Sequence, residues 1–241
     1  MIKTVFDFPI GIYDIDTSED INKSLIDTAF KCTECKITEE AFNTLYSTSI
    51  DSFIGAHHPL FNRIHLYSSF PMSFLQQVMD CIKSYFETTN ICTFGFPGAI
   101  PYIDKSWCTI VDSSDNIGVH NHVPQEHAQY GPILSLAYYP DDMLNKGNFK
   151  IGDMTYADYN PESKKFKREN YEIIETKKSR LIVFPSYVYH MTENNSSEHR
   201  RISYSFDINL VGTKTFLPPP NLMAELYHAF NQELEIIGEN R

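Results

Sequence analysis

The sequence predicts a β-rich α+β fold, a barrel or jelly roll with helices packed on one face. Residues 1–90 hold one strand followed by helical patterns, residues 91–212 hold short β-rich runs, and residues 213–241 hold a Pro-rich linker and a last helix. Because the strands are gathered in the middle of the chain, we expect them to form sheets that the flanking helices cover. A chain of 241 residues is a usual length for one such domain.

The first 90 residues begin with an expected strand, Val5–Asp14, and then turn helical. Thr17 and the acids after it can cap a helix whose apolar spacing continues to Phe30. A second helix is expected over Thr38–Leu45, and a loop over Ser47–Pro71. Residues Met72–Phe86 carry apolar side chains at i, i+3, i+4 and i+7, which predicts an amphipathic helix.

From Ile91 onward, apolar runs are short and separated by Gly, Pro, Asn and Asp, as expected of strands. Two runs, Leu134–Tyr139 and Leu181–Phe184, are almost wholly apolar. The strand pattern ends near Val211, after which Pro218–Pro220 interrupts the chain and Asn221–Ile237 reads as a helix.

Composition excludes several classes of protein. The net charge of −11 argues against a nucleic-acid partner, and 42% hydrophobic residues argue against disorder. No apolar run approaches membrane-spanning length and no signal peptide is recognisable, so a cytoplasmic protein without a membrane partner is expected; nothing excludes a homodimer.

Five cysteines, an odd number, favour a reducing compartment. Cys32 and Cys35 are interpreted as free thiols, since no second pair completes a zinc site.

Three histidines form the strongest chemical signal. His120 and His122 lie two residues apart in Gly118-Val-His-Asn-His122, so on an extended strand both project from one face. His190 follows a later apolar run and the segment Pro185-Ser-Tyr-Val-Tyr. Imidazoles that converge from two strands make a site for a first-row transition metal.

The strand Arg200–Leu210 indicates which arginine matters. Its even positions are apolar (Ile202, Tyr204, Phe206, Ile208) and its odd positions are polar (Arg201, Ser203, Ser205, Asp207). The even face suits packing against helices, and the odd face suits the lumen of a barrel. Arg201 and Ser203 are therefore expected to point inward and Arg200 to be solvated. An inward guanidinium can hold a carboxylate with two hydrogen bonds, although a structural ion pair is the alternative.

The order His-x-His, His, Arg-x-Ser resembles that of the iron(II)- and 2-oxoglutarate-dependent oxygenases built on the double-stranded β-helix. The similarity is greatest to a branch that carries His-x-His where most relatives carry His-x-Asp. The opening strand, Ser106-Trp107, Leu134–Tyr139 and Arg201–Phe206 are also similar to that branch. The resemblance extends from the N-terminus to about Asn209.

This resemblance implies a fold, two cofactors and a reaction. The fold would be a double-stranded β-helix, a jelly-roll or cupin-like barrel, with N-terminal helices and a C-terminal helix beside it. His120, His122 and His190 would hold Fe(II), and Arg201 with Ser203 would hold the distal carboxylate of 2-oxoglutarate. Tyr138 or Tyr139 would reach the co-substrate or substrate, with Tyr138 as the named candidate. Dioxygen and a small-molecule or peptide substrate would be the partners, with hydroxylation and release of succinate and CO2.

Alternatives remain open for the third ligand and for the function. Besides His122, the third ligand could be Glu126 or a water. His120-x-His122-x-x-x-Glu126 has the spacing of a cupin metalloenzyme, in which Glu126 would be a ligand and no 2-oxo acid would be needed. A barrel that has lost its chemistry and serves as a binding or structural protein is the other alternative. A group of basic residues between Lys146 and Arg168 is interpreted as a solvated hairpin or an entrance for anions.

Overall fold

We describe the chain from a computed structural model. The residues that the structure describes are 1–5, 8–34, 70–89, 100–122, 132–152, 159–160, 165–166 and 171–211.

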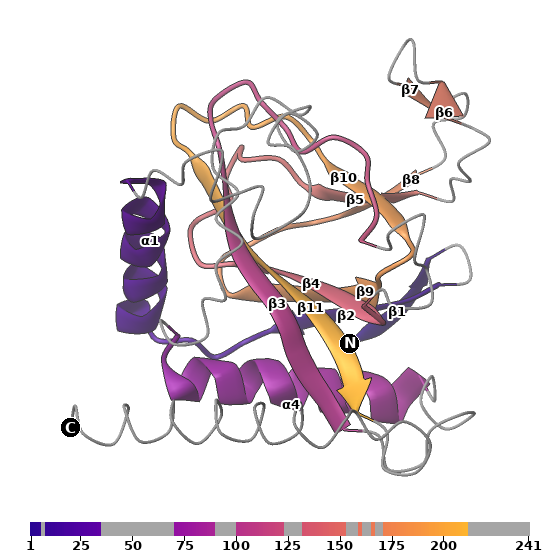
Figure 1. Ribbon diagram of the computed structural model, residues 1–241. Helices are drawn as coiled ribbons and strands as arrows, with labels where there is room; N and C mark the ends of the chain where they lie inside the picture. The colour runs from indigo at the N-terminus through magenta and orange to yellow at the C-terminus, as the bar shows by residue number, and fades with distance from the viewer. Residues whose placement is uncertain are drawn as a thin grey trace, which may run out of the picture.

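The larger of the two main sheets has six antiparallel strands and runs through the middle of the molecule (Figure 1). Its order is β1 (Ile2–Val5), β2 (Phe8–Asp14), β9 (Arg180–Pro185), β4 (Leu134–Tyr139), β11 (Arg201–Val211) and β3 (Ile100–Val111). The predicted first strand is therefore a hairpin, β1–β2, and β2 joins it to the rest of the sheet by pairing with β9.

The smaller sheet has the order β10 (Tyr189–Thr192), β5 (Phe149–Gly152) and β8 (Tyr171–Ile174). His120 adds to its free edge through an isolated antiparallel bridge to His190 on β10. The short strands β6 (Tyr159–Asn160) and β7 (Lys165–Phe166) form a separate pair.

The two sheets face each other, and the chain passes back and forth between them. Apolar side chains of β4 and β9 pack in one cluster with those of β5 and β8. From β3 onward the chain supplies strands to the larger sheet (β3, β4, β9, β11) and to the smaller one (residues near 120, β5, β8, β10) in the order of a double-stranded β-helix. This confirms the predicted jelly-roll architecture.

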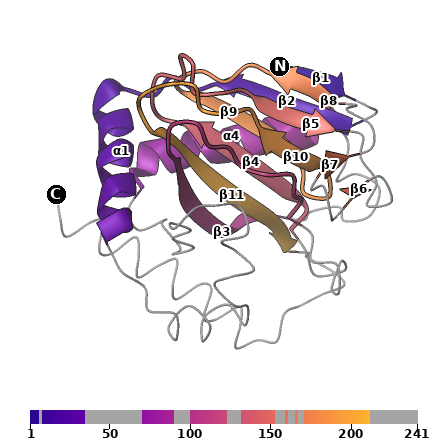
Figure 2. The same ribbon diagram turned by 90° about the horizontal axis from the view of Figure 1, so that it is seen from above.

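Two helices cover the outer face of the larger sheet (Figure 2). Helix α1 (Glu19–Glu34) and helix α4 (Met72–Thr89) bury apolar side chains against the even-numbered positions of β4 and β11. Phe74 on α4 lies at the centre of this layer, 4.8 Å from the ring of Tyr138 and 6.3 Å from that of Phe206. Neither described helix combines the length and apolar character needed to cross a bilayer.

The helical predictions that fall on described residues are confirmed: the pattern from Thr17 to Phe30 became α1, and Met72–Phe86 became most of α4. The helices expected over Thr38–Leu45 and Asn221–Ile237 lie outside the described residues, as do Cys35 and nearly all of the loop predicted over Ser47–Pro71.

Replacing Phe74 with Ala should lower the free energy of unfolding by about 3–5 kcal/mol, because the ring is fully buried and its removal leaves a cavity between sheet and helix. Urea unfolding followed by circular dichroism measures this loss. The control is Met72→Ala on the same helix, where the side chain is 38% exposed and a loss of less than about 1 kcal/mol is expected. Equal losses in the two variants would contradict this account of the core.

Candidate metal and co-substrate site

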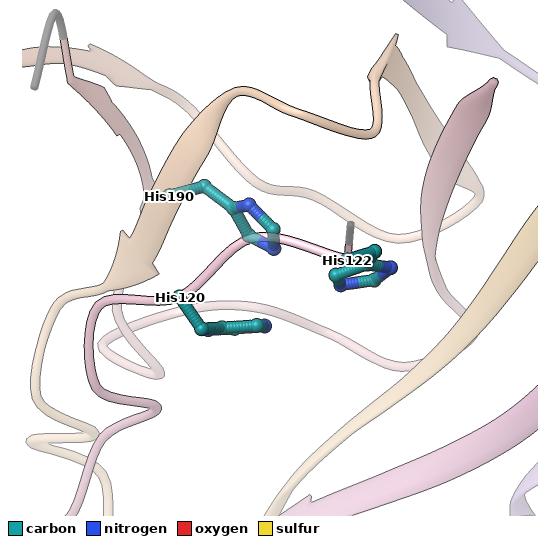
Figure 3. A group of neighbouring side chains, drawn as sticks. All are labelled: His120, His122 and His190. Atoms are coloured by element: carbon teal, nitrogen blue, oxygen red, sulfur yellow. The ribbon is translucent and has the colours of Figure 1, made fainter. Parts of the chain in front are cut away.

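The three predicted histidines meet between the two sheets because backbone pairing places them there. The His120 amide donates to the His190 carbonyl at 3.0 Å, and the His190 amide donates back to the His120 carbonyl at 2.9 Å. The His122 amide donates to the carbonyl of Ser186, in the turn that leads into β10, at 2.9 Å. As a result the three side chains point toward one another (Figure 3).

The imidazoles are close enough to share one ion. The ring centroids are 4.2 Å apart for His120 and His190, 5.0 Å for His122 and His190, and 5.3 Å for His120 and His122. One nitrogen of each ring lies within 4.8 Å of the corresponding nitrogen of the other two.

The second nitrogen of each ring is held by an oxygen acceptor. Nδ1 lies 2.8 Å from the Gly118 carbonyl in His120, 3.0 Å from the Val188 carbonyl in His190, and 2.6 Å from Asp207 Oδ1 in His122. Because carbonyl and carboxylate oxygens only accept, Nδ1 carries the proton in each ring. Nε2 then keeps its lone pair, so the donor set suits a first-row metal ion.

His190 is the most enclosed of the three ligand candidates. Its ring packs on those of Phe184 and Phe149, with centroids at 4.6 and 5.3 Å. Burial, and next the two neighbouring imidazoles, hold the pKa of His190 well below its usual value. The neutral imidazole, which is the form that binds metal, therefore predominates.

The predicted orientation of β11 is confirmed. Arg201 and Ser203 are buried on its inward face, whereas the even positions Ile202, Tyr204 and Phe206 pack in the cluster that includes the helices. Arg200 is half-exposed and forms an ion pair with Asp112 at 2.7 Å.

Arg201 is fully buried, and its contacts with described residues use some but not all of the N–H groups of its guanidinium. Nη1 donates to the backbone carbonyls of Lys146 and Glu193 at 3.0 and 3.1 Å, and Nη2 donates to Thr192 Oγ1 at 2.6 Å. Nε has no hydrogen-bond partner among the described residues. The Nε–H and one Nη2–H are thus left on neighbouring nitrogens, which is the arrangement that binds both oxygens of a carboxylate.

Strand β10 links the arginine to the histidines. His190 and Thr192 occupy alternate positions of this strand, so they share a face and lie about 6–7 Å apart. Both are buried, and Thr192 receives the Nη2 hydrogen bond of Arg201. The hydroxyl that Arg201 contacts therefore lies one strand alternation away from His190.

The prediction that Tyr138 reaches the co-substrate is wrong. Its ring packs in the cluster that includes the helices, and its hydroxyl donates to Asn22 Oδ1 at 2.6 Å and contacts Thr17 Oγ1 at 3.1 Å. Tyr139, the other member of the pair, lies on the inward face of β4. It is buried near enough to Arg201 that the two groups interact electrostatically, while burial raises the pKa of the phenol.

The remaining predictions have mixed outcomes. Glu126, the alternative ligand, lies outside the described residues. Trp107, named in the sequence analysis only as part of the resemblance, is buried and lies beside the site, with its ring centroid 5.3 Å from that of His122. Lys146 is buried and paired with Asp141 at 2.5 Å, and Lys150 lies 3.5 Å from Glu193, so neither is the solvated hairpin residue that was expected.

Asp207 and Ser135 are site residues that sequence reasoning missed. Ser135 Oγ lies 2.8 Å from His122 Nδ1 and donates to Asp207 Oδ1 at 2.9 Å. The signal for Asp207 was present, since it shares the odd-numbered face of β11 with Arg201. Its partner was not visible, because the contact depends on the register between β11 and β4.

Comparison with known proteins agrees with this geometry. Residues 105–207 match the model of the family described as "Putative 2OG-Fe(II) oxygenase", where 2OG is 2-oxoglutarate. No curated protein sequence gives a significant match to the chain.

Three examples illustrate the similarity of the chain to solved structures. AviO1 from Streptomyces viridochromogenes Tue57 is 11% identical, with 88% of this chain and 92% of that chain covered and a TM-score of 0.51. A Pseudomonas putida prolyl-4-hydroxylase is 10% identical, with 82% and 91% covered and a TM-score of 0.50. A viral collagen prolyl hydroxylase from Paramecium Bursaria Chlorella virus-1, in complex with 2OG, is 12% identical, with 83% and 94% covered and a TM-score of 0.49. At 11% and 10% identity, the similarity to AviO1 and to the prolyl-4-hydroxylase concerns the fold alone.

The depressed pKa of His190 predicts a pH dependence of stability in the metal-free protein. The unfolded chain takes up this proton near pH 6.5, whereas the folded protein does so only at much lower pH. Stability is therefore complete above pH 6.5 and falls below it, by up to about 1.4 kcal/mol per pH unit from this group. Urea unfolding of wild type and His190→Gln at pH 7.5, 6.5 and 5.5 measures the difference. Identical slopes in both proteins would contradict the prediction.

Proposed function

We propose that the chain, whose residues 105–207 match the model of the family described as "Putative 2OG-Fe(II) oxygenase", is an oxygenase that hydroxylates a small-molecule or peptide substrate and releases succinate and CO2. The family uses Fe(II) and 2-oxoglutarate, and dioxygen is the other reactant. We further propose that the described elements form one oxygenase domain, because β2 and both helices pack on the sheet that carries the site.

One observation carries the proposal: a three-imidazole cluster lies beside a strand, β10, whose Thr192 contacts a buried arginine, and the Nε of that arginine has no partner among the described residues. A metal-binding protein without a 2-oxo acid would need the histidines but no inward cation. A structural arginine would be expected to have its donors satisfied by the protein, since an unmade hydrogen bond in a buried place costs about 1–3 kcal/mol.

We assign roles to the residues accordingly. Nε2 of His120, His122 and His190 would hold Fe(II), while Nδ1 of each ring fixes its orientation. Arg201 and Ser203 would bind the distal carboxylate of 2-oxoglutarate, and Tyr139 replaces Tyr138 as the phenol beside it. When bound, iron and 2-oxoglutarate supply the oxidative chemistry, in which dioxygen is reduced and one oxygen atom goes to the substrate.

The surroundings of the site support this use. Phe149, Phe184 and Trp107 contact the imidazole cluster and are buried, so they limit the access of water. Electrostatic interactions are stronger in such a setting than in water, which strengthens the pairing between Arg201 and a carboxylate.

Anaerobic titration with Fe(II), followed by 2-oxoglutarate, tests the proposal. A weak visible charge-transfer band on adding 2-oxoglutarate, and succinate formation once dioxygen is admitted, are the expected results. Metal binding without the band would favour the cupin alternative with Glu126. Failure to bind metal would favour a binding or structural protein.

His190→Ala should abolish stoichiometric Fe(II) binding, because it removes one Nε2 from the cluster. Isothermal titration under anaerobic conditions gives the stoichiometry, and circular dichroism shows whether the variant is folded. His199→Ala is the matched control, since His199 is exposed and lies outside the cluster. Undiminished Fe(II) affinity in His190→Ala would refute the ligand assignment.

Arg201→Ala should leave Fe(II) binding largely intact but weaken 2-oxoglutarate binding by about 2–5 kcal/mol, because a buried charge pair loses one partner. Arg201→Lys should recover only part of this loss, since an ammonium cannot reproduce the two-nitrogen contact. The control is Arg200→Ala, which removes a half-exposed ion pair. The affinity is read from the charge-transfer band, and a larger effect from Arg200→Ala would reject the assignment.

A further inference from the structure

We propose that Asp207 is a positioning residue of the metal centre that acts through His122, fixing its ring and supplying negative charge to a site of neutral ligands. The inference rests on the proposed function, because it takes His122 as a ligand. It concerns a residue that does not itself belong to the three-histidine cluster.

The position of Asp207 follows from strand register. Asp207 lies directly opposite Ser135 on β4, and both side chains are on the inward face of the larger sheet. A bulge in the pairing of β11 with β3 falls immediately after Asp207, a kind of irregularity that often re-aims a side chain beside a functional site. Its carboxylate thereby reaches His122.

The contact between the two side chains is close and shielded from solvent. Asp207 Oδ1 lies 2.6 Å from His122 Nδ1, and the two side chains are each 8% exposed. Ser135 donates to the same oxygen at 2.9 Å and is itself 2.9 Å from Ser186 Oγ. Rotation of the His122 ring would break these bonds in a place where water cannot replace them, so the ring is held with Nε2 toward the cluster.

The charge of Asp207 has a second consequence. Three imidazoles neutralise none of the double charge of a divalent ion, and Nδ1 of each of the other two rings lies against a neutral backbone carbonyl. A carboxylate hydrogen-bonded to Nδ1–H raises the basicity of the ligating nitrogen opposite. Through His122, Asp207 would thus strengthen binding of the divalent ion and stabilise its more oxidised state.

Two substitutions separate orientation from charge. Asp207→Asn keeps an oxygen that can accept from Nδ1–H but removes the charge, whereas Asp207→Ala removes both. We expect Fe(II) and Co(II) affinity to fall about 10-fold in Asp207→Asn and about 100-fold in Asp207→Ala, the range known for partners of ligating histidines. The Fe(III)/Fe(II) reduction potential should rise in both variants.

The experiment is anaerobic titration of the full chain with Fe(II) and with Co(II), together with the visible spectrum of the Co(II) form, which reports the ligand field. Asp112→Asn is the matched control, because that carboxylate pairs with Arg200 at the surface.

The failures are distinguishable. Wild-type affinity and an unchanged Co(II) spectrum in Asp207→Asn would overturn this inference and leave the proposed function standing. Loss of all metal binding in Asp207→Asn, with binding retained in His122→Ala, would overturn it by showing that Asp207 is a ligand. A wild-type protein that binds neither ion would overturn both proposals.

Discussion

The antiparallel placement of β11 between β3 and β4 is the constraint on which the whole site depends. This placement turns the odd-numbered side chains of β11 inward. At one end of the strand Arg201 then contacts Thr192 on β10, and further along Asp207 contacts His122. A slip of one residue would turn Ile202 and Ile208 inward and put the arginine against the helices. The apolar even-numbered side chains of β11 pack against α1 and α4, and this packing opposes such a slip. The hydrophobic core therefore fixes which side chains of β11 face the histidines.

Burial gives the polar groups of the site their properties. Two histidines bond to backbone carbonyls through Nδ1, and the guanidinium of Arg201 bonds to two more carbonyls, so the backbone itself orients these side chains. Such contacts need no reorganisation when a metal or an anion binds. The same burial keeps the His190 imidazole neutral, which is the form that binds a metal cation. Arg201 is buried as well, and its guanidinium can bind a carboxylate.

Prediction from sequence succeeded where polarity alternates. In β11 the polar and apolar positions alternate, so the inward Arg201 was identifiable although most residues of the strand are buried on both faces. Strand β4 is buried at all six positions and apolar at nearly all of them, so periodicity carried no information and the wrong tyrosine, Tyr138, was named. The bond between His122 and Asp207 spans 85 positions and depends on register, which one sequence does not reveal.

A crystal structure of the protein with Fe(II) and 2-oxoglutarate, prepared without oxygen, tests the central claim most directly. The account predicts Nε2 of His120, His122 and His190 at about 2.0–2.2 Å from the metal and a carboxylate of the co-substrate on Nε and Nη2 of Arg201. Coordination by Glu126 in place of His122, or an imidazole of His122 more than about 3 Å from the metal, would contradict it.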